Sequence, residues 1–271
     1  MKNRMKSHIY FPSQPEIQKN TLFYQELRPV KLWYSKDVAL FYQFKTVDDS
    51  TTYLSLIPDG CFDFLFCCDP NHPSAFLWTS PFYRKRQPEF RRGCEYFGVR
   101  FFPEQSVIKL NNSMNELLAQ QIPLIEVMDN IEYLIEWIVL GNSFQERTER
   151  FVNYLEKLRT DLGKDQKMIR YAIDHIYSSG AMVTVQELSD SIGFSEQHIR
   201  RKFETYIGFS PKEFGQIVRF QNTLDMFLDN KESKLLDIIY ENGYYDQAHF
   251  IKGFKKLIQL TPKQYKKFLI G

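Results

Sequence analysis

The last third of the chain contains the same helical unit twice, and this repeat constrains the fold more than any other feature of the sequence. Phe203 and Phe254 lie 51 positions apart, and Pro211 and Pro262 share that offset. Each proline follows a hydroxyl residue that opens a Ser/Thr-x-x-Glu/Gln capping box, which marks a helix start. Proline fits the first helical position because its missing N–H has no intrahelical partner there. The repeat therefore predicts two homologous helical modules in tandem.

The first module has the pattern of two helices joined by a tight turn. A capping box at Thr184 precedes apolar residues at helical spacing. Gly193 then supplies the positive φ that a sharp helix end requires, and Phe194 is expected to fill the turn. Ser195 is the expected N-cap of the second helix. Its expected buried positions are Ile199, Phe203 and Tyr206. Two helices joined by a short glycine turn form a helix-turn-helix.

The second module repeats this arrangement. Gly243 is its expected turn glycine, and Asp246 is the expected N-cap of its second helix. The positions expected to be buried are Leu235, Ile238, Phe250, Phe254 and Leu257. The sequence therefore predicts a second helix-turn-helix.

The outward faces of the two second helices, residues 195–206 and 246–258, favour DNA binding. The first presents Gln197, His198, Arg200, Arg201 and Glu204. The second presents Gln247, His249, Lys252, Lys255 and Lys256. Arg, Gln and Lys at the start of such a helix suit the base edges of a major groove. A solvated surface would explain one basic helix, but two in tandem indicate a DNA-binding pair.

The predicted connector between the two units supports this interpretation. Residues 211–228 form an expected helix of about 27 Å, which is close to the ~34 Å between successive major-groove faces on one side of B-DNA. One chain could therefore read two adjacent groove segments.

This region resembles the DNA-binding domain of the AraC/XylS family of bacterial transcription regulators. The matching residues are 192–195, 201–203, 208–211, 219, 242–250, 254–256 and 261–262. The resemblance implies an activator that contacts RNA polymerase as well as double-stranded DNA.

The same resemblance assigns roles to single residues. It places Gln197, Arg200 and Arg201 among the base readers of the first module. It places Ala248, His249 and Lys252 at the readers' positions of the second. Lys252 stands where the family usually has Arg, and lysine lacks the planar fork of arginine. We therefore expect the second module to contact phosphate more than it reads sequence.

Charge, cysteine content and hydropathy argue against a zinc protein, a disulfide-linked protein and a membrane protein. The net charge is only +2, although six lysines and no acidic residue occur from Lys252 onward. The four cysteines contain no Cys-x-x-Cys pair, so neither zinc nor disulfides are expected. No signal peptide or membrane span is expected, which favours a cytoplasmic protein.

The first half of the chain reads as strands followed by helices. The expected strands are 38–46, 52–57, 61–68, 75–79 and 96–102. The expected helices are 115–121, 124–139 and 143–159. Short strands interrupted by Pro and Gly are typical of a small barrel or sandwich.

This half also resembles, less specifically, the cupin-like sensing domain of the same family. The matching stretches are 57–60, 97–103 and 117–124. The resemblance implies an effector bound inside the barrel, and a homodimer formed through strands or the following helices. The aromatic residues are expected mainly in the core, and some could line a ligand pocket. The candidates are Tyr42, Phe44, Phe62, Phe64, Trp78 and Phe101.

Several alternatives stay open at this level. The basic cluster from Arg84 to Arg92 is either a solvated loop or a contact with an anion or with the DNA-binding domain. Trp137 and the apolar stripe at 144–158 fit a core or, in part, a dimer seam. The N-terminal half could serve only to dimerise or to bind another protein.

An enzyme fused to a DNA-binding domain is the alternative from another class. A cupin metal site needs clustered histidines, but His8 and His72 are the only two before residue 175. No metal, cofactor or catalytic residue is therefore predicted.

We predict an α+β protein of two domains. Residues 1–163 form a sensing or dimerisation domain, a small barrel or sandwich with strands at about 8–105 and helices at about 115–160. Residues 164–271 form an all-α tandem helix-turn-helix domain. The expected function is sequence-specific transcription regulation, modulated by a small effector.

Overall fold

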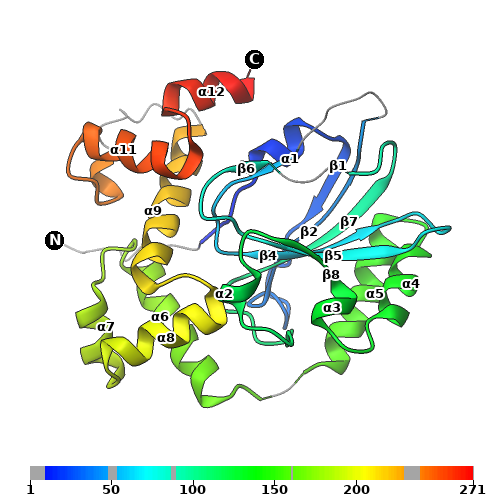
Figure 1. The fold of residues 1–271 in the computed structure, drawn as a ribbon, viewed down its shortest axis with the longest axis horizontal. Helices are drawn as coiled ribbons and strands as arrows, with labels where there is room; N and C mark the ends of the chain where they lie inside the picture. The colour runs from blue at the N-terminus through cyan, green and yellow to red at the C-terminus, as the bar shows by residue number, and fades with distance from the viewer. Residues whose placement is uncertain (1–9, 48–53, 87–89, 160, 229–238, 271) are drawn as a thin grey trace.

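The fold was taken from a computed structural model, which describes residues 10–47, 54–86, 90–159, 161–228 and 239–270 (Figure 1). The N-terminal half is built around an antiparallel sheet, and the C-terminal half is helical. This arrangement confirms the predicted α+β class.

The main sheet has six antiparallel strands in the order β1-β2-β7-β4-β5-β8, and β3 pairs with β6 in a smaller sheet. The strands are β1 Leu22–Leu27, β2 Val38–Lys45, β3 Ser55–Leu56, β4 Phe62–Cys67, β5 Ser74–Thr79, β6 Lys85–Arg86, β7 Glu95–Phe101 and β8 Gln121–Pro123. Five of these fall within the predicted strands or overlap them, and β1, β6 and β8 lack a clear alternating pattern. Among the described strands, β1 and β8 are the two edges, so the main sheet is open rather than closed into a barrel.

Both faces of this sheet are covered, so the central strand β4 is buried along its whole length. Helix α5 (Phe144–Lys157) packs on one face, where the ring of Phe151 lies 6.3 Å from that of Phe64 and 6.1 Å from that of Phe101. Leu56 of β3 and Ile17 pack on the opposite face. Alternate residues of each strand therefore enter different apolar layers.

This alternation separates the six candidate pocket residues. Phe62, Phe64 and Phe101 belong to the layer under α5. Tyr42, Phe44 and Trp78 belong to the opposite layer. All six side chains are at most 3% exposed. They do not converge on one cavity, because neighbouring side chains in the sequence pattern point to opposite faces.

The helices that follow the sheet are shorter than the apolar pattern predicts. They are α2 Met114–Leu117, α3 Leu124–Val127, α4 Glu132–Val139 and α5 Phe144–Lys157, and the short helix α1 Pro15–Lys19 precedes the sheet. The expected helix at 124–139 is broken because Asn130 adopts a left-handed φ of 56°. Phe151 and Leu155 are fully buried, so this part of the 144–158 stripe is core, and its interpretation as a dimer seam is wrong.

The C-terminal half contains both predicted modules. Its helices are α6 Lys164–Ser178, α7 Val185–Ile192, α8 Glu196–Ile207, α9 Pro211–Leu228, α11 Gln247–Ile258 and α12 Pro262–Ile270. The connector α9 has the predicted 18 residues. Leu235 and Ile238 lie outside the described residues. No helix in the described part of the chain is long and apolar enough to cross a membrane.

Candidate DNA interface

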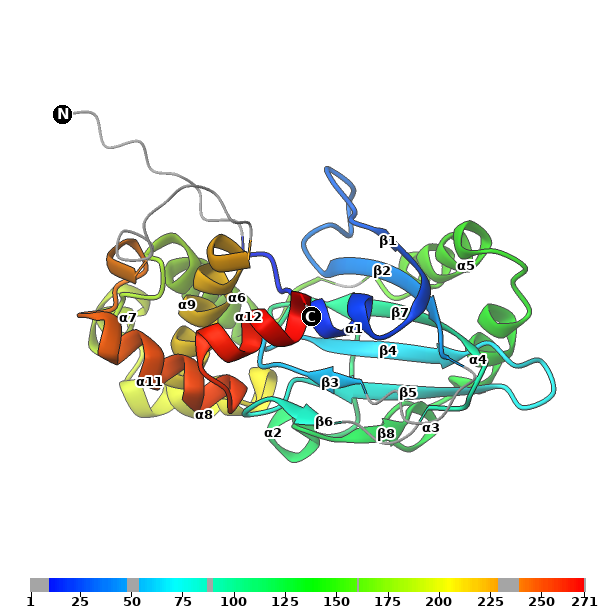
Figure 2. The same cartoon turned by 90° about the horizontal axis from the view of Figure 1, so that it is seen from above.

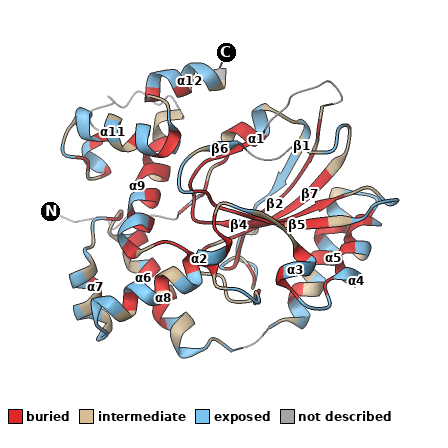
Figure 3. Ribbon diagram, viewed as in Figure 1, coloured by how far each residue is buried: buried red, intermediate tan, exposed pale blue. Residues whose placement is uncertain are grey.

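Helix α8 is held by the local signals that its sequence carries. Gly193 ends α7 with a φ of 77°, and the Ser195 hydroxyl accepts a hydrogen bond from the amide of His198 at 3.3 Å. The buried stripe consists of Ile199, Phe203 and Ile207. Figure 3 shows the resulting alternation of buried and exposed residues along α8.

Tyr206 does not belong to that buried stripe, contrary to the prediction. Its side chain is 37% exposed, because Ile207 occupies the place two helical turns after Ile199. Phe194 does not fill the turn either. It is 46% exposed, and its ring stacks on the imidazole of His198 with centroids 4.9 Å apart.

Helix α11 has the same construction. The Asp246 carboxylate accepts a hydrogen bond from the amide of His249 at 2.7 Å. The buried residues are Phe250, Phe254, Leu257 and Ile258. Figure 2 shows that α8 and α11 lie along the same edge of the helical half, while Figure 1 shows them separated along α9. The two capped helices therefore lie on the same side of the helical half.

The predicted contact residues lie on those free faces. Gln197, Arg200 and Arg201 on α8 are exposed, as are Gln247, Ala248, His249, Lys252, Lys255 and Lys256 on α11. Within the described part of the chain, the side chains of Gln197, Arg200 and Arg201 make no hydrogen bond or ion pair. Their donors are therefore available to an external partner.

Three of the predicted contact residues already have local partners: the two histidines, and Lys256, whose ammonium donates to the side-chain oxygen of Gln216 at 3.5 Å. His198 is half-buried by its stacking on Phe194. Nδ1 of His249 accepts a hydrogen bond from the amide of Tyr245 at 3.3 Å. One ring nitrogen of His249 is thus used to hold the turn before α11.

The capping box at the start of α9 lies between the two modules. The Glu213 carboxylate accepts hydrogen bonds from the amide and hydroxyl of Ser210 at 2.9 and 2.6 Å. Burial acts to raise the pKa of Glu213, but these hydrogen bonds and the charges of Lys256 and Arg200 outweigh it, so its pKa falls below the usual value. Positive charges on both α8 and α11 therefore act on the N-terminus of α9.

Arg219 ties the modules together from the middle of α9. Its guanidinium donates to the carbonyl oxygen of Ala181 at 2.7 Å, before the first module, and to that of Gly243 at 3.2 Å, in the turn of the second. Through these two hydrogen bonds the connector supports both modules.

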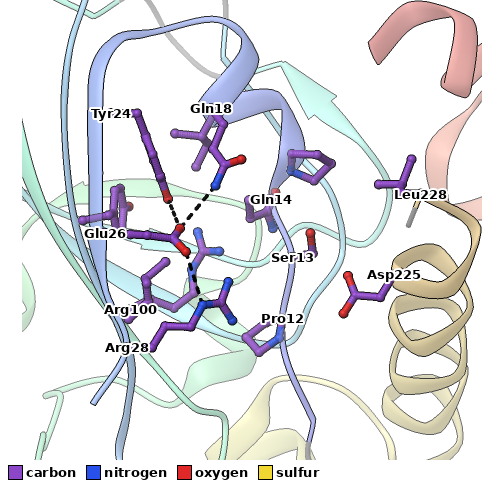
Figure 4. A pocket seen from close by; sticks show the side chains of 14 residues that line it. Pro12, Ser13, Gln14, Gln18, Tyr24, Glu26, Arg28, Arg100, Asp225 and Leu228 are labelled. Atoms are coloured by element: carbon purple, nitrogen blue, oxygen red, sulfur yellow. Dashed lines mark hydrogen bonds and ion pairs between the residues drawn. The ribbon is translucent and has the colours of Figure 1, made fainter. Parts of the chain in front are cut away.

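The N-terminal half meets α9 at a polar cavity of about 230 Å³ (Figure 4). Its lining includes Ser13, Gln18, Glu26, Arg28, Tyr42, Arg100, Asp225 and Leu228. Tyr42 is the one candidate pocket residue in this lining. The sequence pattern gave no sign of the cavity, because its walls come from β1, residues 12–18 and α9.

A buried ionic group forms the floor of this cavity. Arg100 donates to both carboxylate oxygens of Asp63, at 2.8 and 2.7 Å, and Tyr42 donates to the same carboxylate at 2.7 Å. Burial raises the pKa of Tyr42 well above its usual value. At the mouth, Glu26 accepts hydrogen bonds from Tyr24 at 2.9 Å and from Gln18 at 3.2 Å. The floor is internally paired, whereas the mouth is open to solvent.

A second cavity, of about 470 Å³, lies between the loop after β7 and helices α6 and α8. Glu104 in its wall accepts a hydrogen bond from Tyr177 at 3.0 Å, and burial raises the pKa of this carboxyl group to about 7. Both cavities lie at the seam between the sheet and the helical half.

The described residues contain no cluster of His, Cys, Asp and Glu that could hold a metal ion. The four cysteines are free thiols in the structure.

Comparison with known proteins identifies the helical half. Residues 188–267 match a family model described as a helix-turn-helix domain. A regulator of Haemophilus influenzae, named only as an uncharacterized HTH-type transcriptional regulator, is 36% identical over 83 residues, which is 31% of this chain and 28% of that protein. A Staphylococcus aureus protein of the same description is 31% identical over 84 residues, 31% of this chain and 11% of its own length. The chain thus matches less than a third of the length of either relative.

Two solved structures are also similar. ToxT from Vibrio cholerae O395 aligns over 92% of this chain and 98% of its own, with 14% identity and a TM-score of 0.44. The C-terminal domain of AraT, a response regulator from Geobacillus stearothermophilus, aligns over 40% of this chain and 88% of its own, with 21% identity and a TM-score of 0.35.

Proposed function

We propose that the protein is a sequence-specific transcription regulator whose C-terminal part is an AraC-type helix-turn-helix domain. Helices α8 and α11 enter two adjacent major-groove segments of one DNA duplex. The observation that supports this proposal is the pair of capped helices, on one side of the helical half, whose exposed residues include the donors Gln197, Arg200, Arg201, Lys252 and Lys255. Such a pair suits base edges and phosphates that alternate along a duplex.

The two helices have different tasks in this proposal. Arg200 and Arg201 offer planar guanidinium groups, which pair bidentately with guanine, and Gln197 suits adenine. Lys252, with Lys255 and Lys256, offers point charges that neutralise phosphates. The N-terminus of α9 at Ser210 is capped and lies near both modules, and in this proposal it positions the phosphate backbone of the DNA.

The experiment that tests this function is selection of genomic fragments with the purified full-length chain at ~0.15 M salt, with and without non-specific competitor. We expect a motif with two half-elements about one helical turn apart. Recovery of one short element would restrict sequence readout to α8. Failure to enrich any sequence, with every fragment retained equally, would contradict sequence-specific regulation.

We further propose that a small effector acts at the 230 Å³ cavity rather than inside the sheet. This volume is below the roughly 300–1,000 Å³ of drug-sized ligand sites, and the lining is mainly polar. A small hydrogen-bonding molecule fits these properties better than a long apolar chain. Arg28 and Asp225 on opposite walls would let such a ligand contact both halves (Figure 4). A thermal-shift screen of small polar metabolites, repeated with Arg28→Ala, tests the site.

Activation through RNA polymerase, a homodimer and a cytoplasmic location complete the proposal. The dimer surface of this proposal includes α4 and the residue after it, where Tyr133 and Leu140 are 69% and 60% exposed. The competing function is a regulator whose N-terminal half only dimerises, and a chain that dimerises but answers to no metabolite would favour it. A catalytic metal in the purified protein would instead favour an enzyme.

A further inference from the structure

Gln221 on the connector α9 is completely buried, although its side chain points away from the helical half. Its carboxamide oxygen accepts a hydrogen bond from the amide of Ser13 at 3.0 Å. Its nitrogen donates to the carbonyl of Pro58 at 2.7 Å and, at 3.4 Å, to that of Ser13. A buried carboxamide with all these partners in the N-terminal half fixes the connector to that half.

Two turns earlier on the same face of α9, the connector meets the turn that contains Pro58 a second time. A Cβ on Gly60 would lie 2.7 Å from the ring of Phe214, so this ring packs directly on the glycine backbone. The turn at residues 58–60 therefore touches α9 at positions 214 and 221, which share one side of the helix.

The N-terminal half also holds the end of the first recognition helix. Gly208 ends α8, and a Cβ there would lie 2.6 Å from Cγ of Leu118, which follows α2. The neighbouring Phe209 packs edge-on against Phe82, with ring centroids 5.4 Å apart. Both contacts involve the turn between α8 and the connector.

A third contact holds the end of the second recognition helix. The amide of Arg84 donates to the carbonyl of Leu257, in the last turn of α11, at 2.6 Å. The Arg84 guanidinium is paired with Glu16 at 2.6 and 2.8 Å and lies over the ring of Phe268 in α12. Of the two sequence interpretations of the basic cluster, contact with the helical half is the correct one for Arg84.

We propose that the N-terminal half sets the distance between α8 and α11, with Gln221 as the positioning residue, and thereby selects operators by the spacing of their half-elements. This inference rests on the proposed function. One base pair more or less displaces a half-element by about 3.4 Å along the axis and rotates it by roughly 35°. A chain whose recognition helices are each held at their C-terminal end, and whose connector is held at Gln221, cannot follow that change. A chain that lacks the contacts of the N-terminal half with Gln221, Gly208 and Leu257, which together form the clamp, has fewer constraints on the position of α11 relative to α8.

The test uses the full-length protein and the selected operator, with the half-element spacing changed by one and two base pairs in each direction. For the unaltered chain we expect affinity to fall about tenfold per base pair of change, comparable to the loss of one base contact. Gln221→Glu keeps the shape but cannot donate to Pro58. We expect it to bind the best-spaced operator less tightly and to lose at least threefold less affinity than the unaltered chain when the spacing changes.

The matched control is Asn222→Ala, one residue further along α9, whose side chain makes no hydrogen bond within the described structure. It should keep the sharp spacing profile. Leu118→Ala, which loosens the contact at Gly208 without burying a charge, should flatten the profile as Gln221→Glu does. If Gln221→Glu fails to fold, judged by its thermal transition, the result from Leu118→Ala decides.

A DNA-free readout separates this inference from the proposed function. Spin labels at Glu196→Cys and Gln247→Cys, with Cys68 and Cys94 replaced by serine, report the distance between the helix starts. We expect a narrow distribution that broadens with Gln221→Glu. Equal spacing profiles and equal distance distributions in all variants would overturn the inference, even if sequence-specific binding is found. Absence of sequence-specific binding, with the distribution broadened, would overturn the proposed function and leave the clamp standing.

Discussion

The two helix-turn-helix modules share their caps and turns but differ in what they pack against. Phe203 of the first module belongs to the same continuous apolar core as Phe64 and Phe151 of the N-terminal half. Phe254 of the second belongs to a separate cluster, built largely from α9, α11 and α12. The first module is thus structurally part of the N-terminal half, whereas the second is supported mainly by the connector. Two modules with the same local sequence pattern can therefore pack against different parts of the protein.

The outward chemistry follows the same division. The more firmly anchored α8 carries the arginine pair, and α11 carries lysines. Bidentate readout needs a side chain held to a fraction of an ångström, whereas phosphate contact tolerates looser placement. In the proposed function, the first module would therefore contact base edges and the second would contact mainly phosphates.

The largest expected effect is on the free energy of unfolding, and it distinguishes the apolar core that contains Phe203 from the cluster that contains Phe254. Phe203→Ala and Phe254→Ala each remove a buried ring, and each should cost about 3–5 kcal/mol in the free energy of unfolding of the unit that contains it. Because Phe203 shares its core with the sheet, Phe203→Ala should destabilise the whole chain in one transition. Phe254→Ala should leave the sheet transition in place and melt the second module separately. Denaturant unfolding followed by tryptophan fluorescence and by helix signal measures this, and identical profiles would contradict the division.

The next effect concerns base reading. Arg201→Ala should cost about 1–3 kcal/mol of binding free energy on the specific operator and relax its preference at one position. Competition binding against operators with single base changes provides the measurement. Undiminished discrimination by this variant would remove Arg201 from the reading set.

A smaller effect on DNA binding is expected from a substitution on α11. Lys256→Ala should weaken binding to all sequences alike and reduce the slope of log K against log salt by ~1. Titrations of specific and random duplexes from 50 to 200 mM salt measure the slope. A loss confined to the specific operator would show that the second module reads bases as well.

The smallest effect compares the two capping boxes at different pH. The pKa of Glu213 is lowered in the folded chain, so its contribution to stability is present at neutral pH and is lost as the pH falls below the usual carboxyl value of 4.5 through the folded-state pKa. Gln264 occupies the same place in the second box and cannot titrate. Amide exchange at the start of α9 should therefore accelerate on acidification more than at the start of α12. The Glu213→Gln variant should abolish the difference, and its persistence there would assign the acid sensitivity to another group.

The features that could be predicted from the sequence are those that depend on short-range geometry. The caps at Ser195 and Asp246, the turn at Gly193 and the connector 211–228 all appear where their patterns place them. Each depends on residues at most four positions apart, because helix hydrogen bonds and cap contacts span that distance. The exposed faces of α8 and α11 follow from the same periodicity.

The contacts between the two halves could not be predicted in this way, because they join residues far apart in the sequence. Gln221 reads as a surface residue, and only its contact with Ser13, 208 positions away, makes it buried. The amide of Arg84 on Leu257 and the cavity beside Asp225 are equally invisible in local patterns. Periodicity shows which face of a helix or strand is covered. Periodicity cannot show which segment covers that face, because this depends on how distant parts of the chain pack together.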